Sequence, residues 1–156
     1  MEYTVIFDVS ESGYRHWWFP SVGLIFVVIG SVLFRFRHQL GHRTPEFLPY
    51  LFLGFSILWT VFALVVTAAG HSHLSAALRE GRCEVVEGIV TEFQPMPTIG
   101  KGSESFIVSG KRFEYSDFVV SPGFKHSTYK GGPMREGLAV RIHYVGDDIA
   151  RLEVAR

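Results

Sequence analysis

Residues 48–70 read LPYLFLGFSILWTVFALVVTAAG and contain no charged side chain. A helix on the surface of a soluble protein has a polar face, and this stretch has none. About 20 apolar residues are enough to cross the hydrocarbon core of a bilayer. The stretch therefore predicts a transmembrane helix over residues 48–70.

A second uncharged stretch, residues 17–34, reads WWFPSVGLIFVVIGSVLF and predicts a first transmembrane helix. Trp17, Trp18 and Tyr50 stand where interfacial aromatic anchors are expected. The two helices are predicted to form an antiparallel hairpin. Small residues in both helices could allow close packing, and the alternative is that they are present only because small residues are common in membrane spans. The small residues are Gly23, Gly30, Ser31, Gly54 and Ser56.

The connector between the spans, residues 35–47, carries Arg35, Arg37 and Arg43, whereas the segment 1–16 has Arg15 alone. Positive charge favours the cytoplasmic side of a membrane. The sequence therefore predicts a multi-pass protein of a bacterial inner membrane, with the connector in the cytoplasm and both termini on the outer, periplasmic side.

Charge is concentrated beyond the spans, with 11 Lys and Arg and 11 Asp and Glu from Arg79 onward. A nucleic-acid binder usually has a basic excess, so no nucleic-acid partner is expected. The single cysteine, Cys83, excludes an intramolecular disulfide. The spans lack ionisable residues, which argues against a channel or a proton-coupled carrier.

The distal half predicts a helical neck over residues 71–82 and an all-β domain over residues 83–156. Gly81 suits the end of the neck helix. Strand patterns cover residues 83–93, 106–108, 112–115, 138–145 and 149–154, with a possible extension over 117–120. The expected fold is a membrane α-helical hairpin followed by a small, closed, five-stranded OB-like barrel; the alternatives are an SH3-like barrel and a small open sheet.

The first segment, residues 1–16, contains a further alternating pattern in which Tyr3, Val5, Phe7 and Val9 share one side. Two spans return the chain to the side on which it started. This segment is therefore predicted to add an edge strand to the distal domain, in the same protomer or in a neighbouring one.

No catalytic, cofactor-binding or metal-binding residues are assigned. The GKGS segment, residues 100–103, lacks the spacing and the following helix of a phosphate-binding loop. No spacing selects a set of ligands for a metal ion from the histidines His71, His73 and His126. A hydrolytic constellation would have to be drawn from Asp117, His126, His143, Ser116, Ser121 and Ser127, which a domain of this size offers by chance.

The segment SPGFKHSTYKGGP, residues 121–133, is the candidate functional loop. Its prolines and glycines disfavour a helix, and it is long for a passive connection. The residues expected to bind a partner are Phe124, Lys125, His126, Tyr129 and Lys130. Alternatively, Phe124 points inward and closes one end of the barrel.

The run VEGIVTEFQPMP…ESFIVSG…FEYSDFVVSPGF…GGPMREGLAVRIHYVGDDIARLEV resembles a pattern in uncharacterised small bacterial membrane proteins. The layout of two spans and a β domain is also similar to that of NfeD-type proteins, whose OB-like domain is a protein-interaction module. This resemblance implies a protein-interaction role and no known activity.

The expected function is therefore a membrane-anchored, non-catalytic binding or assembly module. Besides the lipid bilayer, its expected partner is another membrane protein or a second copy of the chain. One alternative is a membrane-bound hydrolase that uses the 116–133 loop. Another is a factor that excludes phages or competitors.

Overall fold

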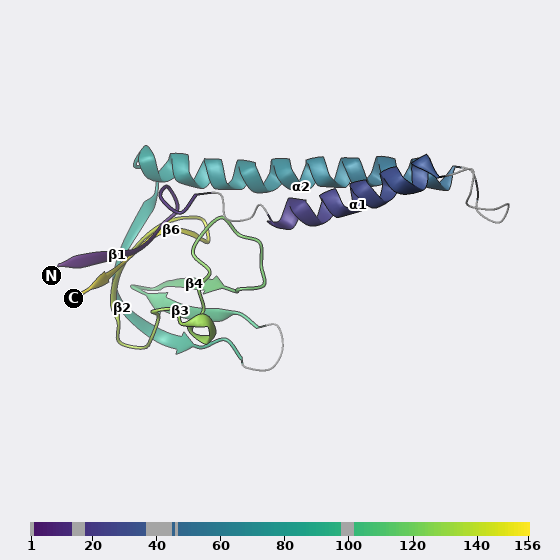
Figure 1. Ribbon diagram of the computed structural model, residues 1–156. Coiled ribbons are helices and arrows are strands. Elements are labelled where there is room, and N and C mark those ends of the chain that lie inside the picture. The colour runs from purple at the N-terminus through teal and green to yellow at the C-terminus, as the bar shows by residue number, and fades with distance from the viewer. Residues whose placement is uncertain (1, 14–17, 37–44, 46, 98–101) are drawn as a thin grey trace. The chain divides into compact units, whose positions relative to one another are not determined.

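Figure 1 shows the computed structural model, which describes residues 2–13, 18–36, 45, 47–97 and 102–156. Of the predicted connector, residues 37–44 and 46 lie outside the described residues, as do Trp17 and the Gly100 and Lys101 of the GKGS segment. The elements in chain order are β1 (Tyr3–Asp8), α1 (Trp18–Arg35), α2 (Leu48–Arg79), β2 (Glu84–Gln94), β3 (Glu104–Val108), β4 (Lys111–Tyr115), the 3₁₀ helix η2 (Thr128–Lys130), β5 (Ala139–Val145) and β6 (Asp148–Ala155).

The chain forms two compact units. The helical unit consists of Tyr14–Ala69, and the β unit consists of Met1–Gly13 and Gly70–Arg156. The helix α2 runs from the first unit into the second, so the predicted neck is the last part of α2.

In the helical unit, α1 and α2 are long and apolar enough to cross a membrane. Glycine permits their close approach: a methyl group on Gly23 would overlap the side chain of Thr60, and one on Gly30 would lie 3.2 Å from the Cα atom of Leu53. The contact point moves from Gly23 to Gly30 along α1 while it moves back from Thr60 to Leu53 along α2, which confirms the antiparallel hairpin. Gly54 has open space around it and so does not serve the contact.

The outward surface of the helical unit is apolar. Nine of its described aliphatic and aromatic side chains are 58–70% exposed: Leu24, Ile25, Val28, Phe47, Leu51, Phe55, Leu58, Phe62 and Val65. Soluble monomers rarely expose so large a contiguous apolar surface. The hydroxyls of Ser56, Thr60 and Thr67 donate to backbone carbonyls one turn earlier, so they are satisfied without water.

The β unit contains one antiparallel six-stranded sheet in the order β1-β6-β5-β2-β3-β4. The prediction of a closed five-stranded barrel is therefore wrong. Closure would require β4, at one end of the five distal strands, to pair with β6 at the other end. In the described chain the outer edge of β6 pairs with β1 instead, and the sheet remains open.

The strand β1 confirms the predicted edge strand, here in the same chain. It pairs with β6 from Tyr3 opposite Ala155 to Asp8 opposite Arg151. Side chains also hold β1 in place: Arg151 of β6 forms an ion pair with Asp8 at 2.7 Å, and the Tyr3 hydroxyl donates to Glu87 of β2 at 2.6 Å. The Asp8 carboxylate is buried, so this ion pair is screened less by solvent than an exposed one.

The distal strands lie close to the residues predicted for them, except near residue 116. The predicted turn between β3 and β4 is present, with Ser109 and Gly110 both at positive φ. The possible extension over residues 117–120 is not a strand, because β4 ends at Tyr115. At the other end, Gly81 adopts φ +69°, and the Arg82 amide donates to the Ala77 carbonyl, which terminates α2 as predicted.

Two apolar clusters fill the β unit. The main core is built from Val90, Phe106, Val108, Phe113, Tyr115, Phe124, Met134, Val140, Ile142, Tyr144, Ile149 and Leu152. A smaller cluster joins Leu74 of α2 to Val9 and Ala150. The last turns of α2 therefore pack into the β unit, to which the residues from Gly70 onward belong.

Candidate functional site

The connection between β4 and β5 is held by a buried carboxylate. Glu104 begins β3 opposite Tyr115 on β4, and it is fully buried. One of its oxygens accepts the Tyr115 hydroxyl at 2.5 Å. The other accepts the backbone amide and the hydroxyl of Thr128, at 2.9 and 2.6 Å. A buried carboxylate with three donors is satisfied, so Glu104 fixes the start of η2 to the sheet.

A second carboxylate fixes the other side of the same turn. The Asp117 side chain is 3% exposed and accepts a hydrogen bond from the buried hydroxyl of Ser127. The Lys130 ammonium lies 3.8 Å from the other Asp117 oxygen. A methyl group on Gly132 would overlap the His126 carbonyl oxygen, so the chain can close this turn only with glycine. Both carboxylates therefore hold the turn of residues 126–132 in place, and this turn is called the platform below.

Tyr115 is shielded from ionisation by this arrangement. Burial raises the pKa of Tyr115 above its ordinary value, and the hydrogen bond to Glu104 and the charges of Glu104 and Asp117 raise it further. The neutral phenol is therefore the donor that Glu104 requires over the whole physiological range of pH.

Replacing Tyr115 with phenylalanine should remove an alkaline loss of stability. In the wild type, the unfolded chain releases the phenolic proton above about pH 10 while the folded chain keeps it. Stability is fully present below that pH, and above it each pH unit costs about 1.4 kcal/mol. Urea unfolding of the full chain in detergent micelles, followed between pH 9 and 11.5, measures this slope. Identical slopes for the wild type and Tyr115→Phe would contradict the assignment.

The predicted partner-binding residues separate into two groups. Phe124 is 6% exposed and makes edge-to-face contacts with Phe7 and Tyr115, with ring centroids 5.6 and 5.2 Å apart. Its ring therefore belongs to the core, which decides between the two predicted orientations. Lys125 is half-buried, and His126 is exposed.

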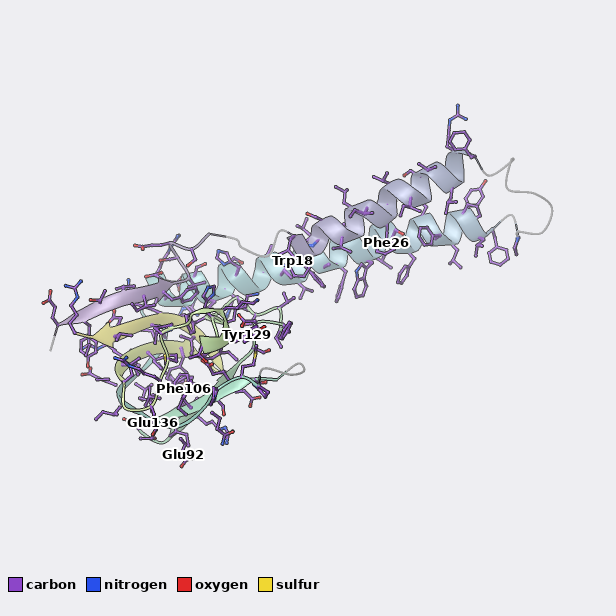
Figure 2. The ribbon with its side chains drawn as sticks, turned by 60° about the horizontal axis from the view of Figure 1, so that its bottom comes forward. Trp18, Phe26, Glu92, Phe106, Tyr129 and Glu136 are labelled. Carbon is purple, nitrogen blue, oxygen red and sulfur yellow. The ribbon has the colours of Figure 1, made fainter. Side chains whose placement is uncertain are left out.

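The short helix η2 supplies the exposed part of the platform. Tyr129 is 59% exposed, and its neighbour Lys130 is exposed as well. Figure 2 labels Tyr129 on η2 and Phe106 on β3. The structure thus places His126, Tyr129 and Lys130 together at the surface of one fixed turn.

Two parts of the site were missed by sequence reasoning. The acid Glu104 precedes the predicted strand 106–108 and carries no pattern that signals burial. Phe118, Val119 and Val120 were expected to extend a strand, but they form an exposed apolar turn. A run of three apolar residues without alternation, ended by Ser121 and Pro122, is the signal that could have revealed it.

A cavity of about 490 Å³ lies beside the loop, lined in part by Arg112 and Glu114 of β4, Val119, Lys125 and Asp148. Its charged residues are of both signs, which does not select one class of ligand. At the edge of the cavity, the Ser121 hydroxyl donates to the Asp148 carboxylate at 2.5 Å.

The hydrolytic candidates are not brought together as a set. Asp117 meets Ser127 and Lys130, while Ser121 bonds to Asp148 and Ser116 donates to the Gly102 carbonyl. His143 lies on β5 opposite Arg151 of β6, and Arg141 is two residues before it on the same strand. Burial lowers the pKa of His143. Within the part of the chain that the structure describes, no hydrogen bond joins His126 or His143 to these serines.

Comparison with protein-family models, with curated proteins and with solved structures found no match to this chain.

Proposed function

We propose that this chain is a membrane-anchored, non-catalytic binding or assembly module. Its two apolar helices serve as the anchor, and its β unit presents a partner-binding surface. The observation that carries the proposal is the platform formed by η2. Glu104 and Asp117 hold the turn from within, while His126, Tyr129 and Lys130 remain at the surface.

A fixed exposed tyrosine beside a lysine is suited to recognition. Tyrosine offers a large apolar face and a polar tip, and little conformational entropy is lost when it binds. The buried carboxylates reduce the entropic cost of binding further, because they already order the backbone of the turn. The proposed partner is another membrane protein or a second copy of the chain.

The contacts of Asp117 favour binding over hydrolysis. One Asp117 oxygen accepts the hydroxyl of Ser127, which is fully buried and so out of reach of a substrate, and the other faces Lys130. The carboxylate is therefore suited to fixing the turn and not to activating a nucleophile. The similarity in layout to NfeD-type proteins supports the same class of function and no mechanism.

Crosslinking from η2 tests the proposal. A photoreactive phenylalanine analogue at Tyr129 of the full-length protein in cells should give a discrete crosslinked product. The same group at Val85, which is 54% exposed on β2, is the matched control and should not give that product. Lys130→Glu should weaken the Tyr129 product several-fold. Equal crosslinking from both positions, or none from Tyr129, would refute the proposal.

We also propose that the anchor lies in a bacterial inner membrane with both termini on the periplasmic side, on the basis of the arginines of the connector. Alkaline phosphatase fused after Arg156 is expected to be active, because this enzyme matures outside the cytoplasm. Activity of a cytoplasmic reporter at the same position would reverse the orientation.

A further inference from the structure

The β unit exposes one compact apolar turn outside its strands. Phe118, Val119 and Val120 are consecutive and 52, 57 and 38% exposed. The Val119 amide donates to the Ser116 carbonyl at 3.3 Å, and the Phe118 amide donates to the Ser116 hydroxyl at 3.4 Å. The turn is therefore ordered, and its apolar side chains do not pack into the core.

A neighbouring contact relates this turn to the end of the apolar helix. Pro122 is the second residue after the turn, and a methyl group on Gly70 would lie 3.8 Å from the Cγ atom of Pro122. Gly70 is the last residue of α2 before the polar segment His71–Ser72–His73, and Gly70 and Pro122 both belong to the β unit. A helix over residues 48–70 spans about 34 Å, close to the thickness of a hydrocarbon core. With residues 48–70 as the membrane span of the proposed anchor, Gly70 lies at the membrane boundary.

The polar groups beside the turn are those found at such a boundary. The Lys130 ammonium lies 5.8 Å from the centre of the Phe118 ring, and Tyr129 is adjacent to it in η2. Lysine and tyrosine side chains place an apolar body toward lipid and a polar end toward headgroups.

We propose that the turn of Phe118–Val120 inserts into the headgroup region of the bilayer that α1 and α2 cross. The inference rests on the proposed membrane anchoring. A bilayer is favoured over a protein as the occupant because Pro122, next to the turn, lies beside Gly70 at the end of the apolar stretch. The exposed apolar residues Val85 and Ile89 lie instead on the strand β2.

Depth-dependent quenching tests the insertion. The full-length chain with Cys83→Ala carries one cysteine at Val119, Ile89 or Leu58, each labelled with an environment-sensitive fluorophore. Val119 and Ile89 are matched at 57 and 59% exposed, and Leu58 is an exposed position within α2. Each variant is reconstituted in phospholipid vesicles that contain lipid with a nitroxide near the headgroup.

Labels at Leu58 and Val119 should be blue-shifted, and the Val119 label should lose about half of its emission, as expected for a group buried roughly 5–10 Å into the interface. The Ile89 label should behave as it does in water. A blue shift at Leu58 without quenching at Val119 would overturn the insertion while leaving the anchoring intact. Equal quenching at Val119 and Ile89 would also overturn it, and the absence of a blue shift at Leu58 would overturn the anchoring itself. Unchanged circular dichroism establishes that each labelled variant is folded.

Discussion

Replacing Glu104 with alanine is expected to lower the free energy of unfolding of the β unit by about 3 kcal/mol. The substitution leaves the Tyr115 hydroxyl and two donors of Thr128 without their acceptor in a buried site. Each unsatisfied buried donor costs roughly 1–3 kcal/mol, and the loss of the buried charge offsets part of the sum. The platform should loosen as well, because Glu104 holds the first residue of η2.

Amide hydrogen exchange of the full-length chain measures this effect. Amides of β3 and β4 that open only with the β unit should exchange about a hundredfold faster in Glu104→Ala. Glu114→Ala is the matched control, since Glu114 is an exposed acid on the adjacent strand and its removal should change stability by less than about 0.5 kcal/mol. Similar exchange rates in the two variants would show that Glu104 does not hold the site.

The second large effect is expected at Phe124. Truncation to alanine removes a buried ring and its edge-to-face contacts with Phe7 and Tyr115, which should cost about 3–4 kcal/mol. The ring joins the loop to both β1 and β4, so protection from exchange should fall in both strands.

Tyr129→Ala provides the comparison for Phe124→Ala within the same loop. Its ring is 59% exposed, so stability should change by less than about 0.5 kcal/mol while partner crosslinking weakens. If Phe124→Ala left stability unchanged and abolished only crosslinking, the ring would be a binding residue and not part of the core.

The arrangement of strands along the chain was largely predictable from sequence, because alternation is a local property. The pattern of residues 138–145 and 149–154 corresponds to β5 and β6, and the pattern at Tyr3 corresponds to β1. Closure of the sheet was not predictable in this way. Whether β6 pairs with β4 or with β1 depends on which distant edge competes for it, and periodicity carries no information about that competition.

The site was predictable in position and not in detail. The prolines and glycines of residues 121–133 correctly indicated an irregular loop, but composition does not say which way an aromatic ring points. Phe124 is buried because Gly123 brings its backbone against β6, where a methyl group would lie 2.9 Å from Ile149 backbone atoms. Glu104 escaped notice because its burial depends on donors from Tyr115 and Thr128, which only the folded chain brings to it.

The pairing of β1 with β6 bears on how the protein is made. The strand β1 precedes β6 in the chain, with α1 and α2 between them, so β1 must wait for its partner until both helices have been synthesised. With α1 and α2 as membrane spans, the two strands meet only when both helices have inserted. A chain with one misinserted helix would leave β6 as an open edge, the kind of surface that promotes aggregation. Completion of the sheet would thus distinguish correctly inserted molecules from faulty ones during biogenesis.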